Sequence, residues 1–573
     1  MLYKANVELI EALKKTIMDM WHIEVMPELT IPDNMEFGDL STNLPFQLAR
    51  ELRRSPKDIG YDIVKNIILP SSFSKVQQAG VGFLNFDYSL DFLRDMLARI
   101  IDKPRDFGKP DNCGERIQIE FVSANPTGPL NVVSARAAAV GSSIVNILRY
   151  VGHDVQGEYY LNDAGNQIRE LTISFILRII EQRGYSVEFG KDSYRGDYLA
   201  NEAVLFADKE PKILENLLEI IEKSDLTSFT SDNVALLIKS NGNKDLLETL
   251  KNWILERMIS EIRVSLENFG VRFDKFFRET ELRNANFVVD TLDKFRAEGL
   301  TFKNEGAEWF DTPVIDPNEK PFVLIKSDGE LTYGAVDIAY HRNKMLRGFD
   351  RLYDIWGPDH HGHIGRIKAA IKALKHECRF DVLVLQQVNL LENGEKIKMS
   401  KRSGNIVTLN ELIEDVGVDV ARFFFIARRM EAHLDFDLDL ARKESDENPV
   451  YYIQYAHARI NGILEHAKIK GYNPSNLGRK ELASLNQPEE LALARKLAQW
   501  SFVLSKCVDE LAPHHLCFYL IELAQTFHPF YAKHRVVGDD PITTMARVAL
   551  CRSIKEVLAL GLSLLGIVAP DNM

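Results

Sequence analysis

The chain has few cysteines, and they lie far apart. Its 573 residues contain five, with no Cys-x-x-Cys pair and no spacing typical of a zinc site: Cys113, Cys378, Cys507, Cys517 and Cys551. An odd number of scattered thiols does not indicate a disulfide framework and is typical of reduced proteins in the cytosol. We therefore expect a cytoplasmic protein that has neither disulfides nor a structural metal.

Long apolar runs are also missing, as are internal repeats and low-complexity tracts. No stretch reaches the ~18 residues that a membrane-spanning helix needs. The start of the chain, MLYKANVELIEALKK, is amphipathic and mixes acids with bases. It predicts a first helix rather than a signal or transit peptide. With 45% hydrophobic and 27% charged residues, the composition is that of a globular protein, and its length predicts several domains.

The chain has no excess of positive charge. Its formal net charge is −13, which argues against a protein that coats nucleic acid by bulk attraction. The charge is uneven, because residues 441–573 hold 15 Lys and Arg against 14 Asp and Glu, which leaves −14 on the remainder. Any contact with RNA would therefore be a local patch, and the C-terminal region is the most suitable place for it.

A turn-rich segment around residues 104–114 marks the end of an N-terminal region. We expect residues 1–108 to form a small α/β domain. After it, residues 117–122 have the period-2 apolar spacing of a strand. A loop with Pro126 and Gly128 then leads into a helical pattern over 135–150 and another strand over 155–160. Strand, loop, helix and strand form a βαβ unit, which binds its ligand at the start of the helix.

Further strand patterns at 321–325, 351–355 and 381–385 alternate with helices. Residues 109–440 are therefore expected to form an α/β domain with a doubly wound, Rossmann-type parallel sheet. Within it, residues 170–265 are mostly helical and charged and are expected to be an insertion. From residue 441 to 573 the helical period is nearly unbroken, which predicts an all-α bundle.

The loop and helix start of the βαβ unit carry a motif. Residues 123–136 read Ser-Ala-Asn-Pro-Thr-Gly-Pro-Leu-Asn-Val-Val-Ser-Ala-Arg. This motif resembles the ATP-binding signature of class I aminoacyl-tRNA synthetases in its arginyl form. The resemblance implies that ATP, with its Mg²⁺, is a cofactor, and that Pro129, Leu130 and Arg136 contact it.

The centre of this motif departs from the family. Where the family has His-x-Gly-His, this chain has Asn131-Val132-Val133-Ser134. The family's histidines stabilise the transition state at the α-phosphate. Asn131 and Ser134 can donate hydrogen bonds, but neither carries the charge of an imidazolium, and the loss of one such donor costs about 2.7–4 kcal/mol. Our hypothesis is that both nevertheless act in catalysis.

A second signature follows about 260 residues later. Lys398, Met399, Ser400 and Lys401 resemble the family's Lys-Met-Ser-Lys loop, whose lysines neutralise the ATP phosphates as pyrophosphate leaves. The resemblance implies that all four bind ATP and that the two lysines are catalytic. They would carry more of the charge here, with help from Arg136 or His360, which is also expected to bind ATP. The preceding Asn393-Gly-Glu-Lys396 predicts a hairpin turn.

A guanidinium ligand needs paired carboxylate acceptors shielded from water. Three further segments resemble the family's arginine site, although any one of these acids alone could be a solvated surface group. Between Tyr333 and Asp337 the chain has Gly334-Ala-Val336, where the family has Phe-Thr-Arg or similar. A metal site is not expected at the nearby His360, His361 and His363, which have no Cys or carboxylate partner at a suitable spacing. The arginine contacts implied by the resemblance are Ser123, Asn125, Glu279, Tyr333, Asp337 and Asp359.

Two regions resemble tRNA-binding parts of the family. The C-terminal region resembles its anticodon-binding bundle, where aromatic rings stack on unpaired bases. A buried aromatic core would explain most of these rings equally well. The N-terminal region resembles the added domain that touches the tRNA elbow. The implied tRNA contacts are Asn43, Asn85, Arg459, Tyr531, Arg535 and Met573.

The resemblance covers essentially the full chain. It implies an arginine–tRNA ligase that acts on L-arginine and tRNA-Arg, with no membrane association and as a monomer. One alternative is a catalytically impaired paralogue that binds tRNA or arginine, because the tetrad is altered. Another is a class I nucleotidyl transferase for a different amino acid, against which Glu279, Tyr333 and Asp337 jointly speak.

Overall fold

The structure is a computed structural model of the whole chain, and the part described is residues 2–32, 37–110, 114–224, 226–240, 244–397, 407–474, 477 and 479–573. It contains two compact units. The first comprises residues 1–114, 146–153 and 443–573, and the second comprises residues 115–145 and 154–442. Among the described helices, none is both long and apolar enough to cross a membrane. The predicted domain boundaries at 108 and 440 stay predictions.

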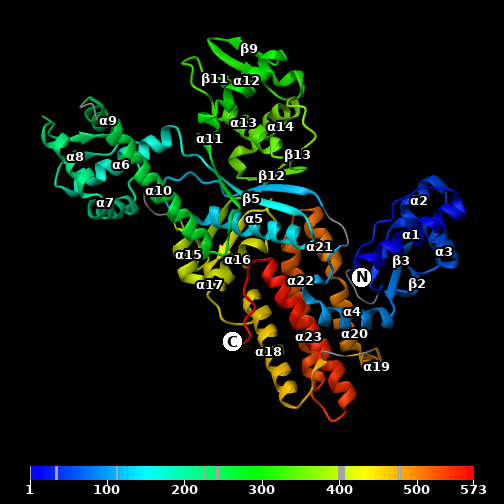
Figure 1. Cartoon of the computed structure of the whole chain (residues 1–573). Helices are drawn as coiled ribbons and strands as arrows, with labels where there is room; N and C mark the ends of the chain where they lie inside the picture. The colour runs from blue at the N-terminus through cyan, green and yellow to red at the C-terminus, as the bar shows by residue number, and fades with distance from the viewer. Residues whose placement is uncertain are drawn as a thin grey trace. The chain divides into compact units, whose positions relative to one another are not determined.

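A five-stranded parallel sheet forms the centre of the second unit (Figure 1). Its strand order is β13-β12-β4-β5-β8, so the chain runs outward from β4 on one side and returns to the other side of β4. The predicted α/β class with a doubly wound parallel sheet is confirmed. The strands are β4 (Arg116–Glu120), β5 (Asp154–Leu161), β8 (Lys275–Arg278), β12 (Arg351–Trp356) and β13 (Arg379–Val384).

The predicted βαβ unit is present. Helix α5 (Val132–Tyr150) joins β4 to β5, and it ends two residues before Gly152, which has φ of 104°. The last four residues of β4 are buried, as expected for a strand covered on both faces. Helix α5 packs so closely on the residue after β4 that a Cβ on Gly141 would lie 2.4 Å from the Phe121 ring.

Two strand predictions were wrong in detail. The segment 321–325 does form a strand, β11 (Phe322–Ile325), but it belongs to a separate antiparallel sheet of order β11-β10-β9. The fifth strand of the central sheet, β8, was not predicted, because it is only four residues long and begins and ends with a basic residue. The partners of β11 are β9 (Thr301–Asn304) and β10 (Ala307–Phe310).

The insertion is helical, as predicted, and has a core of its own. Phe175, Phe206 and Trp253 pack in its centre, with Phe175 stacked on Trp253 at a ring distance of 5.3 Å. Short strands β6 (Val187–Glu188) and β7 (Phe229–Thr230) pair in parallel. The helices are α6 (Asn166–Gln182), α7 (Asp197–Lys209), α8 (Pro211–Glu222), α9 (Ser231–Ser240) and α10 (Lys244–Asn268).

The remaining elements of the second unit are mostly helices, together with a separate three-stranded sheet of order β15-β14-β16. Thr332 caps α13 through its hydroxyl, and a capping box of Thr408 and Glu411 starts α15. The predicted turn at Asn393-Gly394 is confirmed: both residues have positive φ and connect β14 to β15. These elements are α11 (Glu279–Asn284), α12 (Phe287–Ala297), α13 (Tyr333–Leu346), α14 (Ile364–Ala373), β14 (Val388–Glu392), β15 (Glu395–Lys396), α15 (Leu409–Val416), α16 (Val418–Ile426), β16 (Leu434–Asp437) and α17 (Leu438–Ala441), with short 3₁₀ turns η3 (Thr312–Val314) and η4 (Pro358–His363).

The N-terminal region of the first unit combines helices with an antiparallel sheet of order β1-β3-β2. Ser55 and Ser89 cap α3 and α4 through their hydroxyls. Tyr88 packs between Phe73 and Phe92, with ring distances of 4.9 Å to each. The elements are α1 (Leu2–Trp21), β1 (Leu40–Thr42), α2 (Leu44–Leu52), α3 (Pro56–Asn66), β2 (Phe73–Ala79), β3 (Phe83–Tyr88), α4 (Leu90–Asp102) and the 3₁₀ turn η2 (Pro104–Asp106).

The C-terminal region of the same unit is a bundle of helices, as predicted. Trp500 is fully buried and donates its indole N–H to the Phe107 carbonyl at 3.0 Å. Gly108, with φ of 77°, leaves room for this ring, since a Cβ there would lie 2.3 Å from it. The helices are α18 (Pro449–Ile469), α19 (Arg479–Leu482), α20 (Pro488–Ala498), α21 (Trp500–Asp509), α22 (His514–Lys533) and α23 (Pro541–Leu564).

Gly141→Ala tests the close packing of α5. At an open helical position this change stabilises by about 1 kcal/mol. Here we expect a loss of about 1–3 kcal/mol, because the new methyl would overlap the Phe121 ring. Urea unfolding measures the difference.

Gly462→Ala in α18 is the matched control, because a Cβ there has no neighbour within 4 Å. We expect it to be neutral or stabilising. Equal stabilisation by both substitutions would contradict the tight contact between α5 and Phe121.

Candidate functional site

The candidate site lies at the carboxyl edge of the parallel sheet. The chain reverses its direction of strand addition between β4 and β12, and ligands of such sheets bind in the crevice at that point. Several predicted residues directly follow strands that end at this edge. Ser123 and Asn125 follow β4, Glu279 follows β8 and Asp359 follows β12.

The turn that leaves β4 is conformationally unusual. Val122 and Ser123 have φ of 70° and 39°, a region that a β-branched residue rarely adopts. The Ser123 hydroxyl donates to Glu120 Oε1 at 2.8 Å and accepts from the Tyr160 N–H at 3.0 Å. The side chain of Ser123 therefore ties the ends of β4 and β5 together while the backbone turns away.

Asn131 caps helix α5. Its Oδ1 accepts a hydrogen bond from the backbone N–H of Ser134 at 3.0 Å, as an Asn at the N-cap position does. The two predicted catalytic residues are thus neighbours in the first turn of the helix. Val132 between them is fully buried, and Val133 is partly buried. Of the two residues before the cap, Pro129 is partly exposed and Leu130 is buried.

The second signature itself, Lys398 to Lys401, lies outside the described residues. The chain after it returns to the first signature: Leu409 N–H donates to the Leu130 carbonyl at 2.8 Å, and Asn131 and Thr408 form an antiparallel bridge. Segments almost 280 residues apart in the chain are therefore joined at the start of α5.

Arg136, predicted to contact ATP, is fully buried. Its guanidinium donates to the carbonyls of Gln386, Ala432 and Arg429 at 2.8–3.1 Å. In this structure it is a positioning group that ties α5 to the segments around β14 and β16, and it is not placed to contact ATP. His360 is exposed in η4, with its ring 5.9 Å from that of Trp356.

The predicted arginine contacts fall into two groups. Glu279 is buried and accepts from the Tyr160 hydroxyl at 2.9 Å. Burial raises the pKa of Tyr160, and the charge of Glu279 raises it further, with smaller effects of Tyr333 and Asp337. Glu279, Tyr333 and Asp337 are therefore gathered around one buried tyrosine.

The second group is more open. Asn125 Nδ2 donates to Gln167 Oε1 at 2.6 Å, and Asp359 is exposed in η4. Tyr333 of the first group, at the start of α13, is also 60% exposed. The site thus has a buried acidic end at Glu279 and Asp337 and an open end toward β4 and β12.

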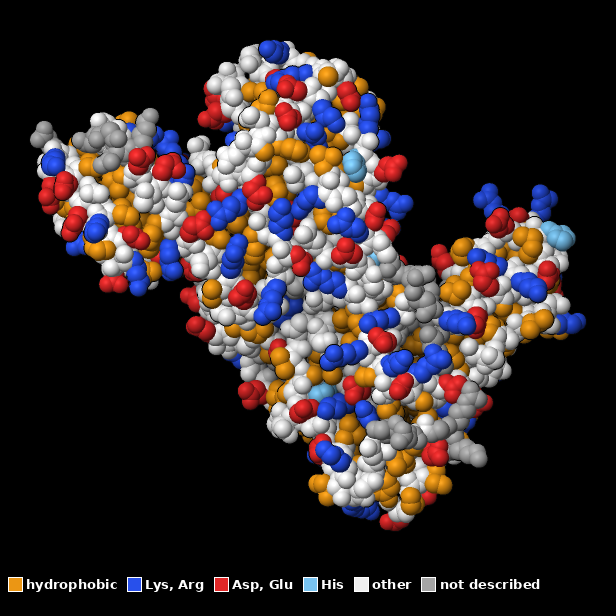
Figure 2. All heavy atoms as spheres, viewed as in Figure 1, with side chains coloured by type: hydrophobic (Ala, Val, Ile, Leu, Met, Phe, Trp, Pro, Cys, Tyr) orange, Lys and Arg blue, Asp and Glu red, His pale blue; other side chains and the backbone are white. Residues whose placement is uncertain are grey.

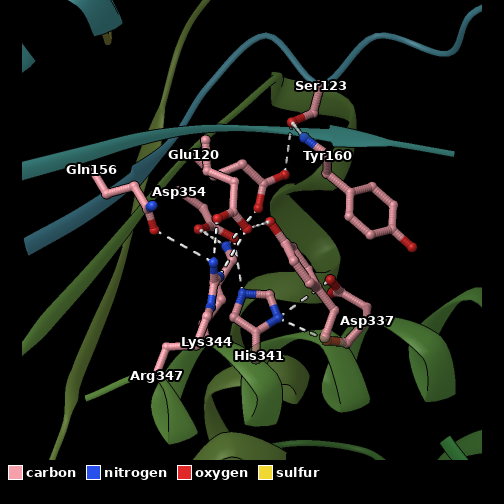
Figure 3. Close-up of polar contacts among 11 residues, drawn as sticks. Glu120, Ser123, Gln156, Tyr160, Asp337, His341, Lys344, Arg347 and Asp354 are labelled. Atoms are coloured by element: carbon pink, nitrogen blue, oxygen red, sulfur yellow. Dashed lines mark hydrogen bonds and ion pairs between the residues drawn. The ribbon is translucent and has the colours of Figure 1, made fainter. Parts of the chain in front are cut away.

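A buried network of charged side chains joins helix α13 to the strands that carry this site (Figure 3). Lys344 of α13 donates to Glu120 of β4 and to Asp354 of β12, the latter at 2.7 Å. Arg347 donates to Glu158 of β5 at 2.9 Å, and Tyr340 donates to the same carboxylate at 2.6 Å. Helix α13 is thereby bonded to three neighbouring strands.

His341 connects the network to the site. Its Nε2 lies 2.8 Å from Asp354 Oδ2, and its Nδ1 lies 3.3 Å from Asp337 Oδ1. Burial disfavours the imidazolium, but Asp337 and Asp354 outweigh burial and the opposing Lys344, and they raise the pKa of His341 to about 10. Burial alone would raise the pKa of Asp354, but Lys344 and His341 lower it to about 2. His341 is thus a cation at neutral pH.

Four residues predicted to contact tRNA meet in one cavity of the C-terminal bundle. Arg459, Tyr531, Arg535 and Met573 line a cavity of about 800 Å³. The Arg459 guanidinium lies 4.9 Å from the centre of the Tyr531 ring, which stacks on Phe527 at 5.8 Å. The cavity therefore combines an aromatic face with cations.

Comparison with known proteins gives the family. Models for the arginyl tRNA synthetase N terminal domain, the catalytic domain of tRNA synthetases class I (R) and the DALR anticodon binding domain match residues 6–88, 98–425 and 453–573. The arginine–tRNA ligase of Carboxydothermus hydrogenoformans is 38% identical over 579 residues, which cover 100% of both chains. The chain belongs to the arginyl-tRNA synthetase family. The arginine–tRNA ligase of Listeria monocytogenes is 39% identical to this chain, and the match covers 99% of both chains.

Solved structures share the fold of the family. The arginyl-tRNA synthetase of Thermus thermophilus superposes with a TM-score of 0.76 over 100% of both chains at 23% identity. The predicted resemblance is therefore confirmed.

The two remaining predicted tRNA contacts, Asn43 and Asn85, lie in the region that matches the N-terminal domain of arginyl-tRNA synthetases. Their side chains differ in exposure. Asn43 is exposed at the start of α2, where its Oδ1 accepts from Gln47 at 3.1 Å. Asn85 is 3% exposed and accepts from the Ser41 hydroxyl at 2.7 Å, so it is not placed to contact RNA. An exposed pair of rings that was not predicted also lies here: Phe46 and Phe83 are 5.0 Å apart.

The buried network was not predicted either. One signal was available, since Asp337, His341 and Lys344 are spaced three and four residues apart and must share a helix face. Their partners Glu120, Glu158 and Asp354 lie on separate strands, and only the strand order brings them under α13.

His341→Gln tests the charge of the network. A raised pKa contributes stability that is complete below the unfolded value of about 6.5 and is lost as the pH rises through the folded value of about 10. At pH 7 the variant should therefore be less stable than the parent by a few kcal/mol, and this difference should shrink toward pH 10. Urea unfolding at both pH values measures it, and a difference that does not change with pH would show that His341 is uncharged.

Proposed function

We propose that this protein is an arginine–tRNA ligase. It activates L-arginine with ATP to arginyl-adenylate and pyrophosphate, and it transfers the arginyl group to the 3′ end of tRNA-Arg. The observation that carries the proposal is the buried acidic end of the site in a chain of the arginyl-tRNA synthetase family: Glu279 and Asp337 are both buried, with Glu279 bonded to Tyr160 and Asp337 3.3 Å from His341. A guanidinium is the ligand that such paired acids suit.

In this proposal Glu279 and Asp337 bind the guanidinium and Tyr333 covers it. Asn125, Ser123 and Asp359 hold the α-amino and carboxylate ends at the open part of the site. Their support is their position after β4 and β12, at the switch point of the sheet. Catalysis is by positioning and by phosphate electrostatics, without a covalent enzyme intermediate.

Membership of the class I family implies the use of ATP. We place its phosphates at the start of α5, near Pro129, Asn131 and Ser134, with Lys398 and Lys401 supplying positive charge. Helix dipole and free N–H groups at that end favour an anion. We assign Mg²⁺ to ATP itself, because the described residues contain no group of three or more His, Cys, Asp or Glu that could hold a metal.

The C-terminal cavity is the proposed site for anticodon bases. Tyr531 would stack on a base, with Arg459, Arg535 and Met573 around it. On the face that Figure 2 shows, acidic and basic side chains are interspersed, which favours a local contact over general attraction of RNA. We further propose a cytoplasmic monomer, and the free cysteines at 378, 507, 517 and 551 fit a reducing compartment.

The altered tetrad motivates the second candidate, a catalytically impaired paralogue. The comparisons do not favour it, since full-length relatives are arginine–tRNA ligases. The two candidates differ in one measurable property, which is the rate of charging.

Aminoacylation of tRNA-Arg with labelled arginine and ATP decides between them. We expect the chain as given to charge tRNA, at a rate within about tenfold of a version with Asn131→His, Val133→Gly and Ser134→His. This follows if Asn131 and Ser134 suffice as donors when the lysine loop is retained.

Lys398→Ala with Lys401→Ala is the control that removes the other source of charge, and it should abolish charging. If only the version with the restored tetrad charges tRNA, the chain as given is a binder and the ligase proposal is wrong.

Tyr531→Ala tests the anticodon site. Stacking on one base contributes about 1–3 kcal/mol, so the KM for tRNA-Arg should rise about five- to hundredfold. Phe518→Ala is the matched control: this exposed ring lies on the same helix, α22, but does not line the cavity. Equal effects of the two changes on the KM, or no effect of either, would show that tRNA does not bind in this cavity.

A further inference from the structure

The carboxylate of Glu279 already forms an ion pair with a guanidinium of the protein. Arg283, one turn later in α11, places Nε and Nη2 at 2.7 and 2.6 Å from Glu279 Oε1. The carboxylate that is proposed to bind the substrate's side chain is thus paired with an arginine of the protein itself.

Both oxygens of this carboxylate already accept hydrogen bonds. A carboxylate offers about four lone-pair sites. Arg283 Nε donates to Oε1, with Nη2 in ionic contact with the same oxygen, and the Tyr160 hydroxyl donates to Oε2 at 2.9 Å. The Asn162 amide, in the orientation that satisfies both its ends, donates to Oε2 at 3.2 Å. A substrate guanidinium can bind Glu279 through paired hydrogen bonds only if a present donor leaves.

Arg283 is the donor best able to leave. Tyr160 is held in the core by ring contacts with Phe277 and Tyr340, at 6.3 and 4.5 Å. The side chain of Arg283 is 38% exposed, whereas that of Glu279 is 5% exposed. Long charged side chains reach water from such positions by rotating about their own bonds. Arg136 is the contrast, since its guanidinium is buried on three carbonyls.

We propose that, before arginine binds, Arg283 occupies the position on Glu279 that the guanidinium of the substrate takes, and that the side chain of the substrate displaces it. This rests on the proposed function. Arg283 keeps a buried carboxylate neutralised while the pocket is empty, because an unpaired buried charge is strongly destabilising. It also sets a threshold for entry, since a ligand must pair with Glu279 at least as well as Arg283 does.

The threshold selects for the side chain of arginine. Lysine offers a compact point charge in place of a planar fork, so it replaces the contacts of Arg283 less well. A neutral side chain would leave the carboxylate without a cation. Arg283 is therefore a specificity-determining residue that acts by competing with the substrate.

The test is the equilibrium Kd of L-arginine, measured by equilibrium dialysis with labelled arginine in the presence of tRNA-Arg. In Arg283→Met the competitor is gone, and arginine should bind about two- to fivefold more tightly, as expected for loss of a partly exposed ion pair. Arg283→Lys keeps a weaker competitor and should tighten binding by a smaller factor. It also keeps the proposal testable if the Met variant does not fold.

Arg296→Met is the matched control. Arg296 pairs with Glu308 in the same unit, with side chains 39% and 9% exposed, and Glu308 lies on β10 of the separate antiparallel sheet. It should leave the Kd unchanged. Tighter binding in the control as well would assign the effect to general loosening of the unit.

The outcomes distinguish a failure of the displacement from a failure of the proposed function. If the parent binds arginine and both Arg283 variants bind it equally or more weakly, Arg283 stays in place or helps to bind the substrate, and the displacement is wrong. If neither the parent nor the variants bind arginine, the proposed function fails and the inference falls with it.

Discussion

The second unit depends on one set of buried ion pairs, those between α13 and the strands beneath it. Lys344 joins Glu120 and Asp354, and Arg347 joins Glu158. These carboxylates lie on β4, β12 and β5, which are neighbours in the sheet. Removing one partner of a buried pair typically costs 3–5 kcal/mol, because the other charge stays behind. The position of α13 on the sheet is therefore narrowly defined.

This constraint determines the shape of the site, because both ends of the network are site residues. At one end Glu120 accepts from Ser123, in the strained turn that leads to Asn125. At the other end His341 lies between Asp354 and Asp337. The acidic pocket and the turn toward α5 are thus fixed by the same charges. A site that relies on position more than on a nucleophile gains from such rigidity.

The sequence predicted well what depends on short stretches of chain and less well what depends on strand order. The βαβ unit, the turn at Asn393 and the C-terminal bundle follow from local patterns, and the structure confirms them. Strand β8 is too short and too charged for its pattern to stand out, and β11 has a strand pattern that does not say which sheet it joins. Arg136 and Asn85 were predicted from position in a motif, but both are buried and serve the fold. Burial of a polar side chain is decided by distant partners, such as the three carbonyls around Arg136, which no local pattern encodes.

The altered tetrad changes charge more than structure. Asn is among the best N-cap residues, and Asn131 caps α5 in the expected way, so the start of the helix keeps its form and its dipole, while the cap itself uses the N–H of Ser134. What the first turn no longer supplies is a titratable cation. Each lost transition-state donor costs about 2.7–4 kcal/mol when nothing replaces it. The joined segments at Leu130 and Leu409 show where replacement charge can come from, because they bring the chain that follows the lysine signature to the start of α5. In the proposed enzyme the positive charge at the phosphates therefore comes from that loop rather than from the helix.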